Sequence, residues 1–434
     1  MSAMLEQNEA GSQMHGWATD LFPLTRSLTG PGTLATLEYL ARLMPGLEIC
    51  SIRSGTQVFD WVVPDEWIMR DAYVMDEDGI RIIDFQVNNL HVLNYSVPVN
   101  DTLTLEELDK HLHSLPDQPE AIPYVTSYYA RRWGFCLSHH QRQKLKPGRY
   151  KVVIDSEIKP GFLNYGEILI PGREKKEILL STYVCHPSMA NNELSGPVVT
   201  TALVRRLLAR KDLRYSYRIV FIPETIGSIV YLSRHYQHLK EVTIAGYVIT
   251  CIGDERTYSF IPSRNGDTLA DRVARHVLKH VYPDYKAYSF LDRGSDERQY
   301  CSPGIDLPVA SVTRSKYGAF PEYHTSLDDL DFVTESGLAG GLDVYQRMLE
   351  CIEQNCYPVS TVLCEPQLGK RGLYPTLSTK ESAKSVKMMM DLIAYSDGKL
   401  SLLDIAELIN APMWKLIAIL DQLVSADLLK KEYR

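Results

Sequence analysis

Residues 179–197 constrain the fold more than any other stretch of the chain. They begin as a continuous apolar strand, break at His186-Pro187, and pass through a polar loop into a long apolar helix. A buried strand followed by a loop that opens a helix is typical of open α/β sheets, which bind ligands beyond the carboxyl ends of their strands. We therefore predict that His186, at the end of this strand, is a metal ligand.

The chain between residues 166 and 350 alternates strand and helix patterns. Strands are predicted at 177–183, 216–222, 244–251, 257–260 and 309–312, and helices at 196–208, 227–235, 269–280 and 335–351. Alternation of this kind predicts an α/β fold in which a mainly parallel sheet is sandwiched by helices.

The segments before this core have other patterns. Residues 1–13 are polar and are expected to form a disordered leader, followed by helices at 14–24 and 34–44. Between residues 47 and 155, strand-like pieces separated by Asp, Gly and Asn turns predict an inserted β-rich subdomain. Its predicted strands are 47–52, 58–63, 67–74, 80–85 and 93–97, and its predicted helices are 103–115 and 138–144.

The C-terminal part is predicted to be a separate domain. Residues 363–379 are rich in Pro and Gly, which is typical of a linker. Helical patterns at 380–393, 401–409 and 412–426 then precede a strand at 427–433, which is the element order of a winged helix. The proposed domains are 14–46 with 156–362 for the α/β core, 47–155 for the insert, and 363–434 for the winged helix.

Charge and cysteine usage limit the partners. The 434 residues carry a formal net charge of -8, which argues against nucleic acid and anionic membranes as partners. From Lys380 onward, eight basic residues balance eight acidic ones, so the winged helix is expected to contact a partner protein or a second copy of the chain rather than DNA. The sequence shows no secretory signal and no CxxC pair among its eight cysteines, which predicts a reduced, cytoplasmic protein.

Metal-binding and acid–base side chains follow the predicted strands. They are His186 with Asn192 and Glu193, then Glu224, Asp254 and His324. Because the carboxyl ends of parallel strands share one edge of a sheet, these side chains can meet there. Histidine nitrogens and carboxylate oxygens bind Zn²⁺, and a free carboxylate such as Glu224 can take a proton from water. Taken singly, each residue could equally be structural, for example as a helix cap or a turn residue.

Six motifs are distinctive. They are residues 185–196 (CHPSMANNELSG), 223–228 (PETIGS), 294–300 (GSDERQY), 322–326 (EYHTS), 26–30 (RSLTG) and 126–135 (TSYYARRWGF). Together they resemble a bacterial family of aminopeptidase-like zinc proteins with a C-terminal winged helix, often encoded near polysaccharide or natural-product biosynthesis genes. That family is a distant branch of the zinc exopeptidases, which include leucyl aminopeptidases, the transferrin-receptor ectodomain and glutaminyl cyclase. The resemblance covers nearly the whole chain from Met14 onward.

The resemblance implies roles for individual residues. His186 and His324 fall on the histidine ligands of the zinc site, and Glu224 falls on the general base. Asp296 resembles an acid that contacts the substrate or supports the site. These assignments imply a hydrolase that cleaves an amide next to a free amine in a peptide or amino-acyl metabolite.

The sequence departs from this family pattern at the metal positions. Asn192 stands where a metal-bridging aspartate is normal, and Thr225 stands where two-metal enzymes carry a ligand carboxylate. Asp254 lies near the position of the second-metal aspartate, although Cys251 is the alternative match. An amide oxygen binds Zn²⁺ less well than a carboxylate, so one Zn²⁺ is expected rather than two.

Further residues are candidates for binding a small peptide or amino-acyl substrate. Asp254 or Asp296 could hold the substrate ammonium, Arg131 and Arg132 could belong to an insert that folds over the pocket, and Arg314 and Tyr317 could hold a carboxylate. Arg131 and Arg132 could equally form an exposed turn, and Arg314 and Tyr317 a solvated loop.

Other function classes remain open. Asn192 and Thr225 favour a diminished binding or scaffold protein on the same fold. Acyl transfer of the glutaminyl-cyclase type also uses one zinc and is a third reading. A DNA-binding regulator is the weakest, because the tail is not basic.

Overall fold

The computed structural model describes residues 2–373 and 380–434, with side chains for 7–373 and 384–434. The chain divides into two compact units. The first comprises residues 1–270 and 285–342, and the second comprises residues 271–284 and 343–434.

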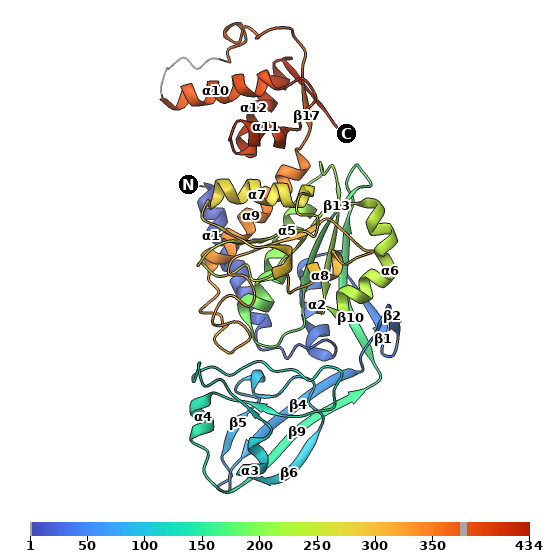
Figure 1. The fold of residues 1–434 in the computed structure, drawn as a ribbon, viewed down its shortest axis with the longest axis vertical. Coiled ribbons are helices and arrows are strands. Elements are labelled where there is room, and N and C mark those ends of the chain that lie inside the picture. Colours follow the sequence, from blue (N-terminus) through green and yellow to red (C-terminus); the bar gives the residue numbers. More distant parts are fainter. Residues whose placement is uncertain (1, 374–379) are drawn as a thin grey trace. The chain divides into compact units, whose positions relative to one another are not determined.

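An eight-stranded sheet forms the centre of the first unit (Figure 1). In spatial order its strands are β1 (Glu48–Arg53), β10 (Phe162–Ile170), β12 (Ser216–Ile222), β11 (Glu177–Tyr183), β13 (Thr243–Val248), β16 (Val309–Thr313), β14 (Ser259–Ile261) and β15 (Lys286–Ala287). Strands β12, β11, β13 and β16 run parallel, whereas β1 and β10 pair antiparallel at one side. The prediction of a mainly parallel sheet is confirmed.

Helices cover both faces of this sheet. Helices α1 (Ser2–Leu21), α2 (Pro31–Leu43) and α5 (Ser195–Leu208) lie on one face, and α6 (Ile226–Val242) lies on the other (Figure 1). Every residue of β11 and β12 is buried, as expected for parallel strands enclosed on two sides. Their mainly apolar character is why the sequence located both strands correctly, although Arg218 lies within β12.

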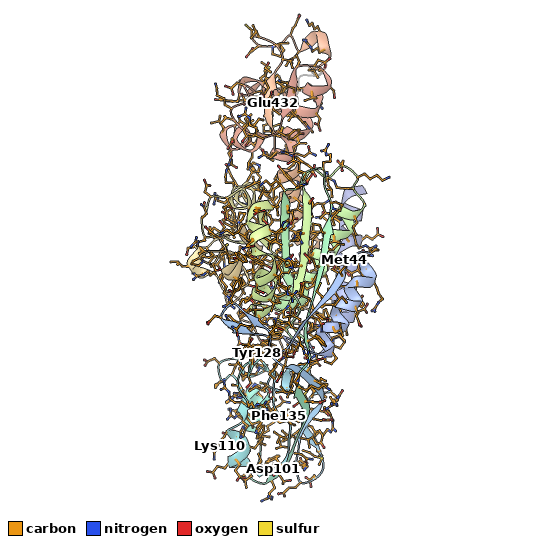
Figure 2. All side chains as sticks on the ribbon, turned by 90° about the vertical axis from the view of Figure 1, so that its right-hand side faces the viewer. Met44, Asp101, Lys110, Tyr128, Phe135 and Glu432 are labelled. Carbon is orange, nitrogen blue, oxygen red and sulfur yellow. The ribbon has the colours of Figure 1, made fainter. Side chains whose placement is uncertain are left out.

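A second sheet of four strands lies in the same unit. Its order is β5 (Arg81–Asp84), β4 (Glu66–Met75), β9 (Arg149–Lys159) and β6 (Val99–Thr104), all antiparallel. Around it lie β7 (Leu112–His113), β8 (Phe135–Cys136), α3 (Leu105–Asp109) and α4 (His139–Gln143), whereas the hairpin of β2 (Gln57–Val58) and β3 (Trp61–Val62) lies beside α6 (Figure 1). Tyr128 lies where this part meets the large sheet, and Asp101 lies at its far end (Figure 2). Strand β1 belongs to the large sheet, although it falls inside the range 47–155 proposed for the insert.

Three local predictions in this region are wrong. Residues 58–63 form a β2–β3 hairpin rather than one strand, and 93–97 form no strand because Tyr95 has φ of 69° and breaks the extended backbone. The helix predicted at 103–115 is only α3. Thr104 starts it with a capping box, but the chain turns after Lys110 into β7.

The N-terminal residues are helical, which corrects the expected disordered leader at 1–13. Helix α1 begins at Ser2, and Met1 lies outside the described residues. Gly11 explains how the helix docks, because a side-chain carbon there would lie 2.3 Å from the backbone oxygen of Glu335. The polar composition of the segment gives no indication of this backbone contact.

The second unit has the predicted winged-helix order. Helices α10 (Lys380–Ala394), α11 (Leu402–Leu408) and α12 (Met413–Ser425) precede β18 (Leu429–Glu432). Strand β18 pairs with β17 (Tyr357–Ser360), which lies before the predicted boundary at 363. Of the linker predicted at 363–379, residues 374–379 lie outside the described residues. Across the described part of the chain, no helix is both long enough and apolar enough to cross a membrane.

His276 ties α7 (Leu269–Val281) to the winged helix within the second unit. Its Nδ1 contacts the Glu407 carboxylate, and its Nε2 accepts the Met413 backbone N–H at 2.9 Å. His276, His280 and Glu407 lie close enough to hold a metal ion, but both ring nitrogens of His276 already have partners. We interpret the group as a structural anchor.

Replacing His276 with alanine is expected to destabilise the second unit by about 2–4 kcal/mol, because it leaves a cavity and an unpaired Met413 N–H. Burial lowers the pKa of His276, so the folded protein binds fewer protons there than the unfolded chain. Stability from this group is therefore present above the ordinary histidine pKa and is lost as the pH falls. Thermal unfolding measures both effects. Lys279→Ala is the control, because its exposed ion pair with Glu407 contributes little, and an equal shift in the two variants would contradict the anchor.

Candidate active site

A cavity of about 380 Å³ opens at the carboxyl ends of β11 and β12. Its walls come from the loops after these strands and from residues of the β-rich part. The lining residues are Leu28, Trp61, Tyr124, Thr126, Tyr128, Tyr129, Cys185, His186, Glu224, Thr225, Ile226, Arg298 and His324. Three of the residues predicted from the sequence, His186, Glu224 and His324, are therefore brought together.

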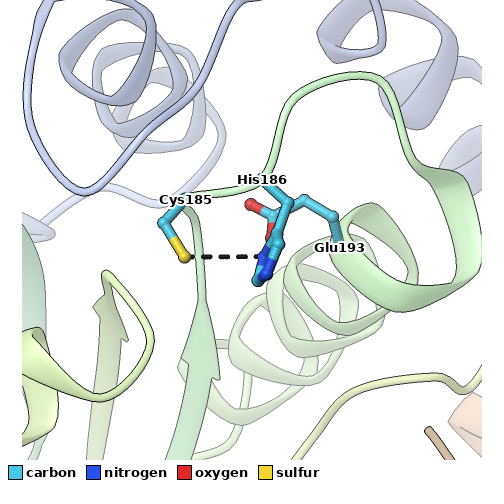
Figure 3. Close-up of side chains that lie close together, drawn as sticks. All are labelled: Cys185, His186 and Glu193. Carbon is cyan, nitrogen blue, oxygen red and sulfur yellow. Dashed lines mark hydrogen bonds and ion pairs between the residues drawn. The ribbon is translucent and has the colours of Figure 1, made fainter. Parts of the chain in front are cut away.

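His186 is fixed by the residues that touch its ring. Its Nδ1 lies 2.7 Å from Glu193 Oε2 and 3.5 Å from Cys185 Sγ (Figure 3). When Glu193 is ionised, its carboxylate accepts the Nδ1 proton and the lone pair of the ring lies on Nε2. That nitrogen lies 3.6 Å from Glu224 Oε2, and both residues line the cavity. This is how proteins present a histidine to a metal.

Glu193 is held by Arg26, and both side chains are fully buried. Arg26 Nε lies 3.5 Å from Glu193 Oε1 and also donates to the His186 carbonyl at 2.8 Å. Burial raises the pKa of Glu193 to about 8, while the Arg26 guanidinium acts in the opposite direction. Glu193 projects from a single π-helical turn, Ala190–Leu194, a distortion that often marks functional sites. Arg26 lies in the motif at 26–30, but no local pattern in the sequence indicates its contact with Glu193.

His324 is the second histidine of the cavity. Its ring centre lies 5.4 Å from that of His186, and its buried Nε2 has no hydrogen-bond partner among the described residues. The backbone N–H of Tyr124 donates to the His324 carbonyl at 2.8 Å, which fixes the loop at φ of 57°. Burial lowers the pKa of both histidines to about 3, so both rings are neutral at pH 7. An unpartnered, neutral imidazole nitrogen in a cavity suits a metal ligand.

The partly exposed Glu224 and the fully buried Asp296 are neighbouring carboxyl groups. Burial, and then the neighbouring Asp296, raise the pKa of Glu224 to about 8. Asp296 Oδ1 accepts the Thr225 N–H and the Ser228 hydroxyl, both at 2.8 Å, and burial raises the pKa of Asp296 to about 6. A raised pKa brings a carboxylate near the range in which a general base works at neutral pH.

Two predicted metal ligands do not reach the cavity. Asn192 Oδ1 accepts the Tyr183 hydroxyl at 2.9 Å, and Asn192 is not a lining residue. The Asp254 carboxylate accepts hydrogen bonds from Asn191 Nδ2, from the backbone N–H groups of Arg256 and Ser315, and from the Ser315 hydroxyl, at 2.8 to 3.0 Å. Its oxygens hold neighbouring loops together, so these contacts do not support the predicted metal role of Asp254.

Four predicted substrate contacts also lie elsewhere. Arg131 and Arg132 are exposed and do not line the cavity. Arg314 Nε donates to the Asp254 carbonyl at 2.5 Å, and the Tyr317 hydroxyl bonds Glu297. Charge in the sequence suggested these residues, but their side chains either face solvent or support loops.

Asp328 and Arg298 are functional candidates that the sequence analysis missed. The buried Asp328 carboxylate accepts the backbone N–H groups of Asn191 and Asn192 at 2.6 and 2.9 Å, and so fixes the loop that carries Glu193. Arg298 lines the cavity beside Glu224. Both lie within or next to motifs in which other residues drew attention, at 294–300 and 322–326.

The donor set fits one Zn²⁺. His186 Nε2 and His324 Nε2 are neutral imidazole nitrogens, and the Glu224 carboxylate lies beside them. Cys185 is a poorer candidate, because burial raises the pKa of its thiol well above the usual value and keeps it protonated. Two bridged metals would need a carboxylate where Asn192 stands.

The chain matches two family models. Residues 15–355 match a family described as a domain of unknown function (DUF4910), and residues 356–431 match the winged helix-turn-helix family. A Clostridium acetobutylicum protein with the provisional name polysaccharide biosynthesis protein with aminopeptidase-like domain is 43% identical over 425 residues. The match covers 98% of this chain and 97% of that protein.

Solved structures share the fold. A crystal structure from Clostridium acetobutylicum, provisionally named a peptidase, has a TM-score of 0.93 at 42% identity, covering 99% of this chain and 98% of that one. A zinc aminopeptidase from Bacillus subtilis has a TM-score of 0.57 at 11% identity, covering 79% of this chain and 94% of that one. A peptidase M28 precursor from Shewanella amazonensis has a TM-score of 0.55 at 13% identity, covering 83% and 98%. At these low identities the last two similarities concern the fold.

Proposed function

We propose that the protein is a zinc-dependent hydrolase. The chain belongs to the DUF4910 family and joins an aminopeptidase-like fold to a winged helix, and the proposal starts from these two facts. It cleaves an amide bond next to a free amine in a small peptide or amino-acyl compound. The observation that carries the proposal is the cavity in which two neutral histidines lie beside Glu224.

His186 and His324 would hold the zinc ion. Bound there, Zn²⁺ would supply Lewis acidity, which polarises a carbonyl and lowers the pKa of water. Glu224 takes the proton from the attacking water and returns it to the leaving amine. Glu193 and Arg26 keep the His186 ring in one tautomer and orientation. The rings of Tyr124 and Tyr128 exclude bulk water from this side of the cavity.

The wider role is part of the same proposal. The name of the Clostridium relative supports a role in polysaccharide biosynthesis, and natural-product biosynthesis is the other setting that we consider. The balanced charge of the tail supports contact of the winged helix with a partner protein or a second copy. The eight cysteines form no disulfide among the described residues, in keeping with the cytoplasm as the proposed location.

Metal analysis tests the zinc site. The parent protein is expected to retain about one zinc per chain after dialysis, because the cavity offers ligands for a single ion. His324→Ala should lose the ion, and Glu193→Gln should weaken zinc affinity by about 10–100-fold, because Glu193 orients His186. His140→Ala, in the exposed part of α4, is the control. A parent protein that binds no zinc at near-stoichiometric supply would contradict the site.

A non-hydrolytic binding protein is the second candidate. Asn192 and Thr225 favour it, because both are neutral where the family resemblance implies carboxylates. A protein that binds amino-acyl compounds but holds no zinc and releases no product would support this candidate over the hydrolase.

A further inference from the structure

Arg298 is the one arginine or lysine among the residues that line the cavity. It lies on the short helix α8 (Glu297–Tyr300), and its Nη2 donates to the Thr225 hydroxyl at 2.5 Å. Thr225 has φ of 65°, which is unfavourable for a β-branched residue and is typically retained at functional sites. This turn gives the guanidinium a fixed anchor next to Glu224.

The rest of the guanidinium lacks partners in the described part of the chain. Nε is buried without a hydrogen bond, and among the described residues no carboxylate forms a direct ion pair with Arg298, although its charge, against the larger effect of burial, acts to lower the pKa of the nearby Glu224 and Asp296. One oxygen of each neighbouring acid is bound by other groups. Glu297 Oε1 accepts the backbone N–H groups of Gly294 and Ser295 at 2.9 and 3.1 Å, and Asp296 Oδ1 accepts the Thr225 backbone N–H and the Ser228 hydroxyl. A half-buried guanidinium with an unpaired Nε and no carboxylate in direct contact keeps donors for a ligand that supplies a carboxylate.

We propose that Arg298 binds a carboxylate of the substrate, so that the cavity takes small amides that carry a free carboxylate close to the scissile bond. The proposal rests on the function proposed above. A guanidinium presents paired N–H donors that match both oxygens of a carboxylate. One guanidinium balances the single charge of a carboxylate but not that of a phosphate dianion.

The cavity limits the rest of the ligand. Its volume of about 380 Å³ holds a small molecule rather than an internal stretch of a polypeptide. The aromatic side chains of Trp61, Tyr124, Tyr128 and Tyr129 line it and offer apolar surface to the body of such a ligand. Trp61 and Tyr129 pack edge to face with ring centres 5.8 Å apart and are partly exposed. The amide, its carboxylate and an apolar side group can therefore occupy the cavity together.

Binding to metal-free protein tests the proposal without turnover. L-alanyl-L-phenylalanine and L-alanyl-L-phenylalaninamide both carry the free amine and differ only in the carboxylate, and their affinities can be compared by isothermal titration calorimetry or NMR. We expect the carboxylate to bind roughly tenfold or more tightly than the amide, because charge-assisted hydrogen bonds contribute more than neutral ones. Arg298→Met should abolish this difference, Arg298→Lys should restore part of it, and Arg131→Met should leave it unchanged.

Two outcomes would overturn the inference. One is a parent protein that binds both ligands equally or binds neither at millimolar concentration. The other is an Arg298→Met variant that is folded by circular dichroism and keeps the preference. Because zinc and turnover are absent from this test, failure of the hydrolase proposal and failure of the carboxylate proposal are separate results.

Discussion

Substitution of Glu224 by glutamine is expected to lower kcat for an amino-acyl amide by about 10²–10⁴-fold. Glutamine keeps the shape of the side chain but cannot accept the proton of the attacking water. The position of Glu224 supports a large effect, since its Oε2 lies 3.6 Å from His186 Nε2 and the side chain lines the cavity. The measurement is the steady-state rate on zinc-loaded parent and variant.

A matched control and metal analysis make this result specific. Glu241→Gln alters an exposed glutamate on the same helix, α6, and should leave the rate unchanged. Zinc content should be determined for each protein, because Glu224 adjoins the proposed ligands and a loss of metal would lower the rate by another route. Full activity in a zinc-loaded Glu224→Gln variant would exclude Glu224 as the base.

Replacing Arg26 with methionine is expected to destabilise the first unit by about 3–5 kcal/mol, because it leaves the buried Glu193 without its counterion. The change also removes hydrogen bonds from Arg26 to the carbonyls of His186 and Leu21, at 2.8 and 2.6 Å. Chemical denaturation, combined with hydrogen exchange of residues 179–197, measures the loss and locates it. Arg53→Met, an exposed position on β1, is the control and should change stability by less than about 0.5 kcal/mol.

The Arg26→Met deficit should depend on pH with a defined sign. Burial raises the folded-state pKa of Glu193 to about 8, above the ordinary value for glutamate. The folded protein therefore holds a proton that the unfolded chain releases, and this group costs stability as the pH rises from the ordinary value toward 8. Without Arg26 the folded pKa rises further, so the deficit should grow with pH. A deficit that shrinks with rising pH would contradict the assigned pair.

Strand positions were predictable where burial on both faces makes the sequence mainly apolar. Strands β11 and β12 were located to the residue, although Ser181, Thr182 and Arg218 lie within them. The β-rich part was predicted less well. Tyr95, with φ of 69°, breaks an apolar run that reads as a strand, and the docking of Gly11 against Glu335 depends on backbone contact that composition does not record.

For the site, the sequence by itself predicted that His186, Glu224 and His324 follow strands of one sheet, and all three line the cavity. Only the tertiary structure decided their partners. In the folded chain the oxygens of Asp254 and Asn192 accept hydrogen bonds from other side chains, and Arg26 lies next to Glu193. Arg298 lines the cavity, whereas Arg131 and Arg314 do not. The physical reason is that the position of a strand end follows from local apolar pattern, whereas the free oxygens and nitrogens of a side chain depend on donors from distant segments.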